Sequence, residues 1–226
     1  MRILLTHHAP LRQSPIGWLV WQWAQGLVSA GDEVHLLVAD EEHRFGEPLE
    51  VERVVCGDDP NADLKFKLPR FSSEYTAGGR PSFADLTDGE LARYRDCLRR
   101  RLDTEILRFD PHVIHAQHLW VLGQLALESG VPYVLNAWDD ELIDYRQDAR
   151  YQPLAEQAAE NASRILVANS ATQQRVESMF ELAADRTLLM PPPWLLDGPA
   201  GEDASRHAAG TQLHALYQTV LSERFG

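Results

Sequence analysis

The stretch that decides the fold is residues 2–39, "RILLTHHAPLRQSPIGWLVWQWAQGLVSAGDEVHLLVA". It begins with a short apolar strand at 2–6 and continues through a Pro- and Gly-punctuated loop at 7–17. A helix then runs to Ala30 and stops at Gly31, and a second apolar strand follows at 33–39. A strand, a helix and a strand in this order predict a right-handed βαβ unit whose two strands are parallel.

The same alternation continues after a weaker region. Between residues 40 and 85 the pattern predicts only one strand, at 51–56, and otherwise a long surface excursion. Thr87 and Glu90 then form a capping box that starts a helix, which ends at Asp110-Pro111. Further strands are predicted at 112–116, 131–138, 165–169 and 187–190, and further helices at 119–129, 153–162 and 171–182, the last capped by Ser170 with Gln173. Gly130 suits the residue just after a helix. The chain is therefore predicted to be an α/β protein with a doubly wound, mostly parallel, Rossmann-like sheet.

The length and composition allow one large domain with an appendage. The chain has 226 residues, of which 44% are apolar, enough to bury a core. We predict a Rossmann-like domain at 1–196, a linker at 197–205 and an amphipathic C-terminal helix at 206–226 that packs back on the sheet.

Charge and cysteine content narrow the class of protein. The formal net charge of −13 disfavours binding to nucleic acid or to anionic lipid. The arginines between Arg93 and Arg101 are interpreted as the solvated face of a helix. Cys56 and Cys97 form no CxxC pair, which fits a reducing cytoplasm. The apolar segments are shorter than the roughly 20 residues that span a bilayer, so any membrane association is expected to be peripheral at most.

Several common sites are not predicted. The loop after the first strand lacks GxGxxG, and neither a GxxxxGK[ST] loop nor a GxSxG elbow is present. No cofactor is therefore expected. His112, His115 and His118 are spaced three apart, but residues three apart on a strand point to opposite faces, so no metal site is expected.

Candidate site residues lie where the predicted strands end, because ligands of open α/β sheets bind at the carboxyl ends of the strands. Gly17 stands before a helix, where free amides could meet a phosphate, or it simply closes the loop. His118 is a candidate base or sugar-hydroxyl ligand, unless it only satisfies a loop carbonyl. Asp139, Asp140 and Glu141 follow a buried strand in a predicted loop, where they bind hydroxyls, take a proton or cap a helix.

Three tryptophans crowd the first helix. Trp18, Trp21 and Trp23 cannot all face the core, and Trp23, in register with Leu27, is the one expected to do so. One or two of the others, Trp18 among them, are candidates to stack on a sugar, to contact a partner protein or to touch a membrane surface.

Four segments together resemble the N-terminal, acceptor-side domain of family 4-like glycosyltransferases of the GT-B type. The first, residues 1–39, resembles that family's first strand, glycine loop, helix and "GHEV"-like strand. The other three are "DPHVIHAQHLW" (110–120), "GVPYVLNAWDDEL" (130–142) and "ASRILVANSATQQRV" (162–176). They resemble the family's D-x-hydrophobic-I-H-x-H strand, its GxPxVxxxHGxD segment, and its adxiixxS strand with the helix that follows. The resemblance covers residues 1–195, and the last helix resembles the GT-B helix that returns to the first domain.

The resemblance implies a single GT-B half that lacks the C-terminal donor-binding domain. After Pro193 the family carries a second Rossmann domain that holds the nucleotide sugar, whereas here a short linker leads directly to the last helix. The family's HG histidine aligns with Asn136 and the family's aspartate with Asp139. The resemblance thus implies that His118 and Asp139 orient the acceptor, that Gly17 approaches the donor phosphate, and that Asn136, Asp140, Glu141 and Trp18 contact substrate.

Three functions remain open from the sequence. The leading hypothesis is an acceptor-binding domain that needs a separate donor-domain partner to transfer a sugar from a nucleotide sugar to an acceptor. The second is a non-catalytic sugar- or protein-binding scaffold derived from a glycosyltransferase, since a fold alone does not confer function. The third is an independent enzyme that uses the cleft for different chemistry.

Overall fold

The computed structural model describes residues 1–11, 14–42, 48–71, 81–192 and 202–225. They form a seven-stranded, entirely parallel sheet in the order β3-β2-β1-β4-β5-β6-β7. The strands are β1 (Arg2–His7), β2 (Glu33–Asp40), β3 (Glu50–Val55), β4 (Val113–Gln117), β5 (Tyr133–Ala137), β6 (Arg164–Val167) and β7 (Thr187–Leu189). The doubly wound sheet predicted from sequence is confirmed. Because the chain reverses direction across the sheet between β1 and β4, the ligand crevice is expected at their carboxyl ends.

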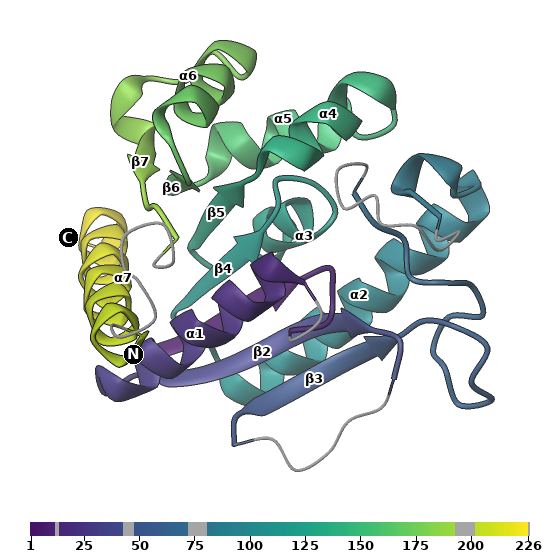
Figure 1. Cartoon of the computed structure of the whole chain (residues 1–226), viewed down its shortest axis with the longest axis horizontal. Helices are drawn as coiled ribbons and strands as arrows, with labels where there is room; N and C mark the ends of the chain where they lie inside the picture. The colour runs from purple at the N-terminus through teal and green to yellow at the C-terminus, as the bar shows by residue number, and fades with distance from the viewer. Residues whose placement is uncertain (12–13, 43–47, 72–80, 193–201, 226) are drawn as a thin grey trace.

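Helices cover both faces of the sheet (Figure 1). Two helices, α1 (Pro15–Ser29) and α7 (Glu202–Phe225), pack on one face and share a core with the alternate residues Ile3 and Leu5 of β1. The opposite face, which Leu4 and Ile114 face, is covered by α2 (Asp88–Phe109), α3 (Leu122–Ser129), α4 (Asp139–Gln147), α5 (Gln152–Asn161) and α6 (Ser170–Met179). The short 3-10 helices are η2 (Phe83–Asp85) and η3 (Ala184–Arg186). Each strand thus contributes alternate side chains to two separate cores.

Caps explain where several helices begin and end. The Thr87–Glu90 box is confirmed, since the Thr87 amide donates to Glu90 Oε2 at 2.9 Å and the Glu90 amide to Thr87 Oγ1 at 3.2 Å. The predicted cap at Ser170 is wrong by one residue, because Asn169 accepts from the Thr172 amide at 2.9 Å. Asparagine caps a helix as well as serine does, and here it stands two residues after the end of β6.

Two other helix starts differ from the sequence prediction. Helix α1 begins at Pro15 rather than after Gly17, because Ser14 is its cap and proline suits the first helical position. Helix α7 begins at Glu202, one turn before the predicted start at 206. The predicted linker at 197–205 is therefore helical from Glu202 on, and its residues 197–201 lie outside the described part of the chain.

The predicted surface excursion between 40 and 85 is wrong for much of its described part. Leu64, Leu68 and Phe71 are at most 5% exposed and belong to the core beside α2. An isolated parallel bridge joins Cys56 to Leu64. Ala62, Leu64, Phe66 and Leu68 alternate with polar residues, so the period-two pattern of a half-buried strand is present in the sequence, although the chain forms only this isolated bridge here. Residues 43–47 and 72–80 of this region lie outside the description.

Helices α1 and α7 meet at two glycines. A Cβ built on Gly210 would lie 2.3 Å from the Gly26 carbonyl oxygen, and one on Gly26 would lie 2.4 Å from the Arg206 carbonyl oxygen. No side chain fits at either position, so the two backbones pack directly on each other. Asp32 secures the contact by accepting from the Met1 ammonium at 2.7 Å and by pairing with His214 at 2.8 Å.

Replacing Gly210 with alanine tests this contact. We expect Gly210→Ala to lower the free energy of unfolding by about 1–3 kcal/mol, because the methyl group overpacks a backbone contact and this outweighs the better helix propensity of alanine. Urea denaturation measures the change. The matched control is Gly89→Ala in α2, where the new Cβ would find only the flexible Arg93 Nη1 at 3.8 Å. A Gly210→Ala protein as stable as the Gly89→Ala protein would contradict the close contact.

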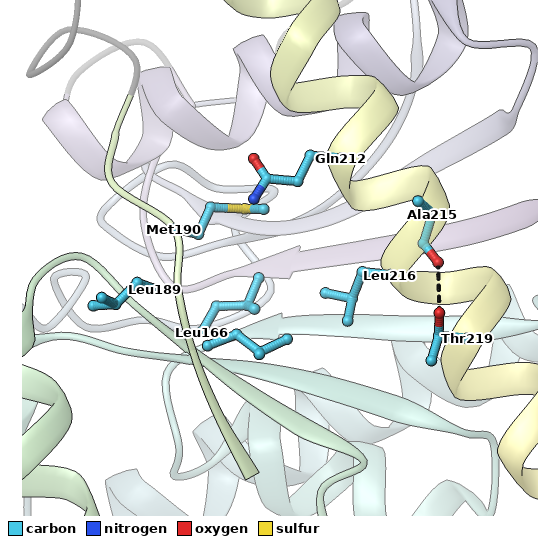
Figure 2. Close-up of a pocket in the computed structure, with 8 residues that line it drawn as sticks. Leu166, Leu189, Met190, Gln212, Ala215, Leu216 and Thr219 are labelled. Atoms are coloured by element: carbon cyan, nitrogen blue, oxygen red, sulfur yellow. Dashed lines mark hydrogen bonds between the residues drawn. The ribbon is translucent and has the colours of Figure 1, made fainter. Parts of the chain in front are cut away.

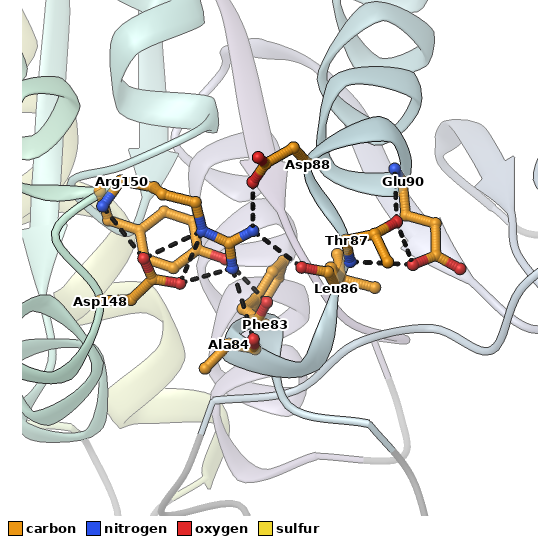
Figure 3. A network of polar contacts seen from close by, with 9 residues as sticks. Phe83, Ala84, Leu86, Thr87, Asp88, Glu90, Asp148 and Arg150 are labelled. Atoms are coloured by element: carbon orange, nitrogen blue, oxygen red, sulfur yellow. Dashed lines mark hydrogen bonds and ion pairs between the residues drawn. The ribbon is translucent and has the colours of Figure 1, made fainter.

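A second junction joins the α4–α5 connection to the start of α2 (Figure 3). Arg150 donates from Nη1 to the Leu86 carbonyl at 2.8 Å and to Asp88 at 2.9 Å, and from Nη2 to Asp148 at 2.5 Å. These bonds raise the pKa of Arg150, and the guanidinium lowers the pKa of Asp148. The Tyr151 hydroxyl adds a bond to the Phe83 carbonyl at 2.8 Å. The planar guanidinium of Arg150 donates to the Leu86 carbonyl and to both carboxylates at once.

Arg150→Lys is expected to loosen this junction. A single ammonium cannot reach the backbone carbonyls and both carboxylates together, so we expect a loss of about 1–2 kcal/mol and faster amide hydrogen exchange at residues 83–90. Hydrogen exchange with mass spectrometry measures this. Arg146→Lys, at an exposed position of α4, is the control. Equal exchange in the two variants would show that the junction adds no local stability.

Candidate functional site

A row of polar side chains crosses the carboxyl ends of the central strands. His7 ends β1, Gln117 ends β4 and Asn136 lies near the end of β5. The β4–β5 register places Gln117 beside Asn136. In the β1–β4 pairing Thr6 lies beside Ala116, which are the residues just before His7 and Gln117. All three are at most 1% exposed, and Trp138, on the same face, is 8% exposed. We call His7, Gln117, Asn136 and Trp138 the polar row.

The polar row carries hydrogen-bonding atoms that no other described residue satisfies. These atoms are both ring nitrogens of His7, Gln117 Oε1, Asn136 Nδ2 and Trp138 Nε1. Leaving a buried polar group without a partner costs roughly 1–3 kcal/mol, so folded proteins rarely do so without water or a ligand. The row offers both donors and acceptors, as a hydroxyl-rich ligand requires.

Three histidine rings meet between β1 and β4. The His118 ring lies 5.6 Å from that of His7 and 5.5 Å from that of His8, measured between centroids. Burial, and secondarily repulsion from His118, lowers the pKa of both His7 and His8, so both are neutral at pH 7. His8 contacts the Trp120 carbonyl through Nε2 at 3.3 Å and the Tyr94 hydroxyl through Nδ1 at 2.8 Å. Because a carbonyl only accepts, Nε2 of His8 carries the hydrogen.

A buried carboxyl group lies behind these rings. Glu141 is 0% exposed and accepts from the Trp138 amide at 2.9 Å and from the Leu119 amide at 2.8 Å. Its Oε2 lies 3.7 Å from Nδ1 of His118. Burial raises the pKa of Glu141 to about 8, although the two amides act in the opposite direction. The structure therefore brings together His118 and Glu141, both predicted site residues.

The loop predicted for Asp139, Asp140 and Glu141 is wrong, because these residues form the first turn of α4, and the alternative that they cap a helix is confirmed for Glu141. Acidic side chains favour this position, where the helix presents free amides. Asp139, whose side chain is 51% exposed, pairs with Arg175 at 2.6 Å and accepts from Thr172 at 3.0 Å, so it joins α4 to α6. It is thus Glu141, rather than Asp139, that lies beside His118.

Gly17 lies in the first turn of α1, where it packs against the loop that follows β1. Its amide donates to Ser14 Oγ at 2.9 Å, and an added Cβ would lie 2.3 Å from the Pro10 carbonyl oxygen. The neighbouring Trp18 is 41% exposed, whereas Trp21 and Trp23 are 2% and 0% exposed. The prediction that Trp23 packs in the core is confirmed, and Trp18 is the member of this group that faces solvent.

The three spaced histidines have separate environments. His112 Nδ1 accepts from the Arg2 amide at 2.9 Å, His115 is buried beneath α7, and His118 lies beyond β4. Across the described residues, no group of three or more His, Cys, Asp or Glu side chains is placed to hold a metal ion.

A separate groove lies between α7 and the strands β6 and β7 (Figure 2). Its volume is about 300 Å³, and its lining includes Leu166, Met190 and Leu216. The polar Thr219 is already bonded to the Ala215 carbonyl of its own helix at 3.1 Å. The groove is mostly apolar and contains none of the predicted site residues.

The match to a family model identifies the kind of domain. Residues 16–193 match the glycosyl transferase 4-like domain. The chain belongs to this family. The resemblance found in the sequence is thereby confirmed, and the parallel sheet flanked by helices is the Rossmann-like half of a GT-B fold. A search of curated proteins finds no match for this glycosyl transferase 4-like domain.

Solved structures with the same fold include a sucrose-phosphate synthase from Thermosynechococcus elongatus, with a TM-score of 0.59 and 13% identity over 84% of this chain and 48% of that one. A shorter chain of the same synthase has a TM-score of 0.52 and 15% identity over 97% of this chain and 99% of that one. A UDP-GlcNAc 2-epimerase from Methanocaldococcus jannaschii has a TM-score of 0.55 and 7% identity over 92% and 49%. At these identities the likeness shows the fold alone.

The domain spans about half the length of the first and third of these structures. Within the described residues, no helix combines the length and the apolar composition that crossing a membrane requires.

Glu141→Gln tests the buried carboxyl group through the pH dependence of stability. The folded-state pKa of about 8 lies above the ordinary 4.5, so the folded state holds this proton more tightly than the unfolded state. This contribution to stability is complete below about pH 4.5 and is lost as the pH rises through about 8. We expect the decline in unfolding free energy between about pH 5 and 8.5 to be smaller in the variant by a few kcal/mol.

Urea titrations at each pH measure the two curves. The slope is the readout rather than absolute stability, because the glutamine amide also places an N–H group against a backbone amide. The lowered pKa values of His7 and His8 act in the opposite direction below about pH 6.5, and they act in both proteins. The difference between the curves therefore isolates Glu141, and parallel curves would show that its carboxyl group does not titrate in this range.

Proposed function

We propose that this glycosyl transferase 4-like domain binds the hydroxyl-bearing acceptor of a glycosyl transfer at the polar row. The observation that carries the proposal is the set of buried, unpartnered donors and acceptors at His7, Gln117, Asn136 and Trp138. A sugar acceptor supplies hydroxyl groups that both donate and accept, so it satisfies such a row without placing a charge in the site.

Glycosyl transfer requires a base near the hydroxyl group of the sugar acceptor. In glycosyl transfer the hydroxyl oxygen attacks the anomeric carbon, the nucleoside diphosphate leaves, and the hydroxyl proton passes to a base. His118 takes this proton in the proposal, and the Glu141 carboxyl group lies 3.7 Å from its Nδ1. Asn136 contributes the amide donor of the row, and the exposed Trp18 offers a ring on which a sugar can stack.

The donor half is proposed to come from a separate chain that binds the nucleotide sugar. Solved structures that share this fold include longer chains, of which this chain spans about half. One of them, from Neisseria meningitidis, is a UDP-GlcNAc 2-epimerase bound to UDP-GlcNAc, with a TM-score of 0.52 and 7% identity over 99% of this chain and 53% of that one. Asp139 and Asp140 lie in the first turn of α4 and Gly17 in the first turn of α1.

A non-catalytic scaffold is the second candidate. Asn136 favours it, because this residue stands where the family's HG histidine is expected and an amide cannot accept a proton at neutral pH. Such a scaffold would bind a sugar or a protein at the same row without turnover.

Calorimetric titration separates the candidates. The chain is titrated with a panel of mono- and oligosaccharide acceptors, and with UDP, GDP and their sugar conjugates, alone and with candidate chains that carry a nucleotide-binding half. We expect acceptor binding by the chain alone, and nucleotide-sugar binding only with a partner. Asn136→Ala should weaken acceptor binding about 10-fold or more, the loss of one buried hydrogen bond. Gln212→Ala, an amide of α7 outside the polar row, is the control.

The other outcomes are equally informative. Tight binding of a nucleotide sugar by the chain alone would overturn the need for a partner. Acceptor binding without turnover under any pairing would leave the scaffold. Asn136→His then tests the family histidine directly, and no gain of activity with partner and donor present would exclude that histidine as the missing group.

A further inference from the structure

The buried ring of His115 joins α7 to the polar row. Its Nδ1 lies 2.6 Å from the Tyr217 hydroxyl of α7, and its Nε2 lies 2.5 Å from Asn136 Oδ1. All three side chains are 0% exposed. Trp23 of α1 stacks on the same ring, with centroids 5.5 Å apart and an interplanar angle of 20°. The ring is therefore held on its two nitrogens and on one face.

The hydrogen positions follow from the chemistry of the partners. Burial lowers the pKa of His115 to about 4, so the ring is neutral and carries one hydrogen. The Asn136 oxygen can only accept, so the hydrogen is on Nε2. Nδ1 must then accept from the Tyr217 hydroxyl, whose own pKa is raised by burial so that it keeps its hydrogen. The three groups thus donate in one direction, from Tyr217 through His115 to Asn136.

This chain of bonds determines the orientation of Asn136. With Oδ1 held by His115, the amide nitrogen must point the other way. It is this nitrogen, Nδ2, that has no partner among the described residues. Gln117 does not compete for the position, because its Nε2 faces the protonated Nε2 of His115 at 3.4 Å and two donors do not bond.

We infer that Tyr217 is a positioning residue that acts through His115 to present the Asn136 amide nitrogen to the ligand of the polar row. The inference rests on the proposed function for its ligand, but not for its geometry. It assigns to α7 a role in the site although Tyr217 lies 102 residues from His115 in the sequence. Docking of α7 at the Gly26–Gly210 contact then becomes a condition for an ordered site.

Tyr217→Phe removes only the hydroxyl and tests the geometry without any ligand. Nuclear magnetic resonance of the ligand-free protein follows the Asn136 side-chain amide and the His115 ring nitrogens. We expect the His115 Nδ1 signal to shift toward that of an unbonded nitrogen, and the Asn136 amide signals to move or broaden. Tyr133→Phe is the matched control, since it removes another buried tyrosine hydroxyl, bonded to the Ala158 carbonyl at 2.8 Å on the opposite face.

A double-mutant cycle then connects the geometry to binding. Tyr217→Phe should weaken acceptor binding several-fold in the presence of Asn136 and have no effect in the Asn136→Ala background, because the hydroxyl acts only through that amide. Tyr133→Phe should leave binding unchanged in both.

The two readouts separate the two ways of failing. Unchanged Asn136 and His115 signals in Tyr217→Phe would overturn the positioning role, as would a hydrogen found on His115 Nδ1 in the parent protein. Shifted signals in a parent that binds no acceptor would overturn the proposed function and leave the Tyr217 geometry established. Equal losses of affinity with and without Asn136 would show that Tyr217 acts on the whole fold rather than on this amide.

Discussion

The site depends on the direct backbone contact between α1 and α7. Gly26 and Gly210 bring the two helices together without intervening side chains, and this close approach lets α7 insert Leu213 and Tyr217 into the core over the sheet. A wider separation would lift the Tyr217 hydroxyl away from His115. The last helix is therefore part of the same structural unit as the sheet, and through Tyr217 and His115 its docking reaches Asn136 of the polar row.

The polar row is costly for the fold to maintain. Its unpartnered atoms lie among residues that are almost completely buried, where a missing hydrogen bond is penalised most. Glu141 adds to this penalty, because its burial raises the pKa of its carboxyl group to about 8. Buried polar groups without partners and a carboxyl group with a shifted pKa are typical of functional sites, where a ligand restores the missing bonds. The junction at Arg150 and the well-packed core on the opposite face supply a rigid frame in which such a row can persist.

Much of the fold was predictable because its signals are local. The apolar strands, the Thr87–Glu90 box, the left-handed Asp110 and Gly130 positions and the amphipathic helices are each specified within a few neighbouring residues. The buried stretch at 62–71 was missed although Ala62, Leu64, Phe66 and Leu68 alternate with polar residues, because this segment forms no regular strand and its burial depends on packing beside α2. The acidic cluster at 139–141 was predicted to be a loop because three adjacent carboxylates are typical of a polar loop. In the structure these residues start α4, and Glu141 caps it by accepting from the Trp138 amide.

The sequence by itself determined most of the order of strands and helices and the family to which the domain belongs, and it predicted the edge of the sheet at which a ligand is expected. These follow from hydrophobic periodicity and from motifs whose order along the chain carries the information. Only the tertiary structure decided which polar residues share the site. It placed Glu141 rather than Asp139 beside His118, assembled His7, Gln117, Asn136 and Trp138 into one row, and brought Tyr217 to His115. These relations join residues far apart in the chain, and they arise from strand register and helix docking, which no local pattern encodes.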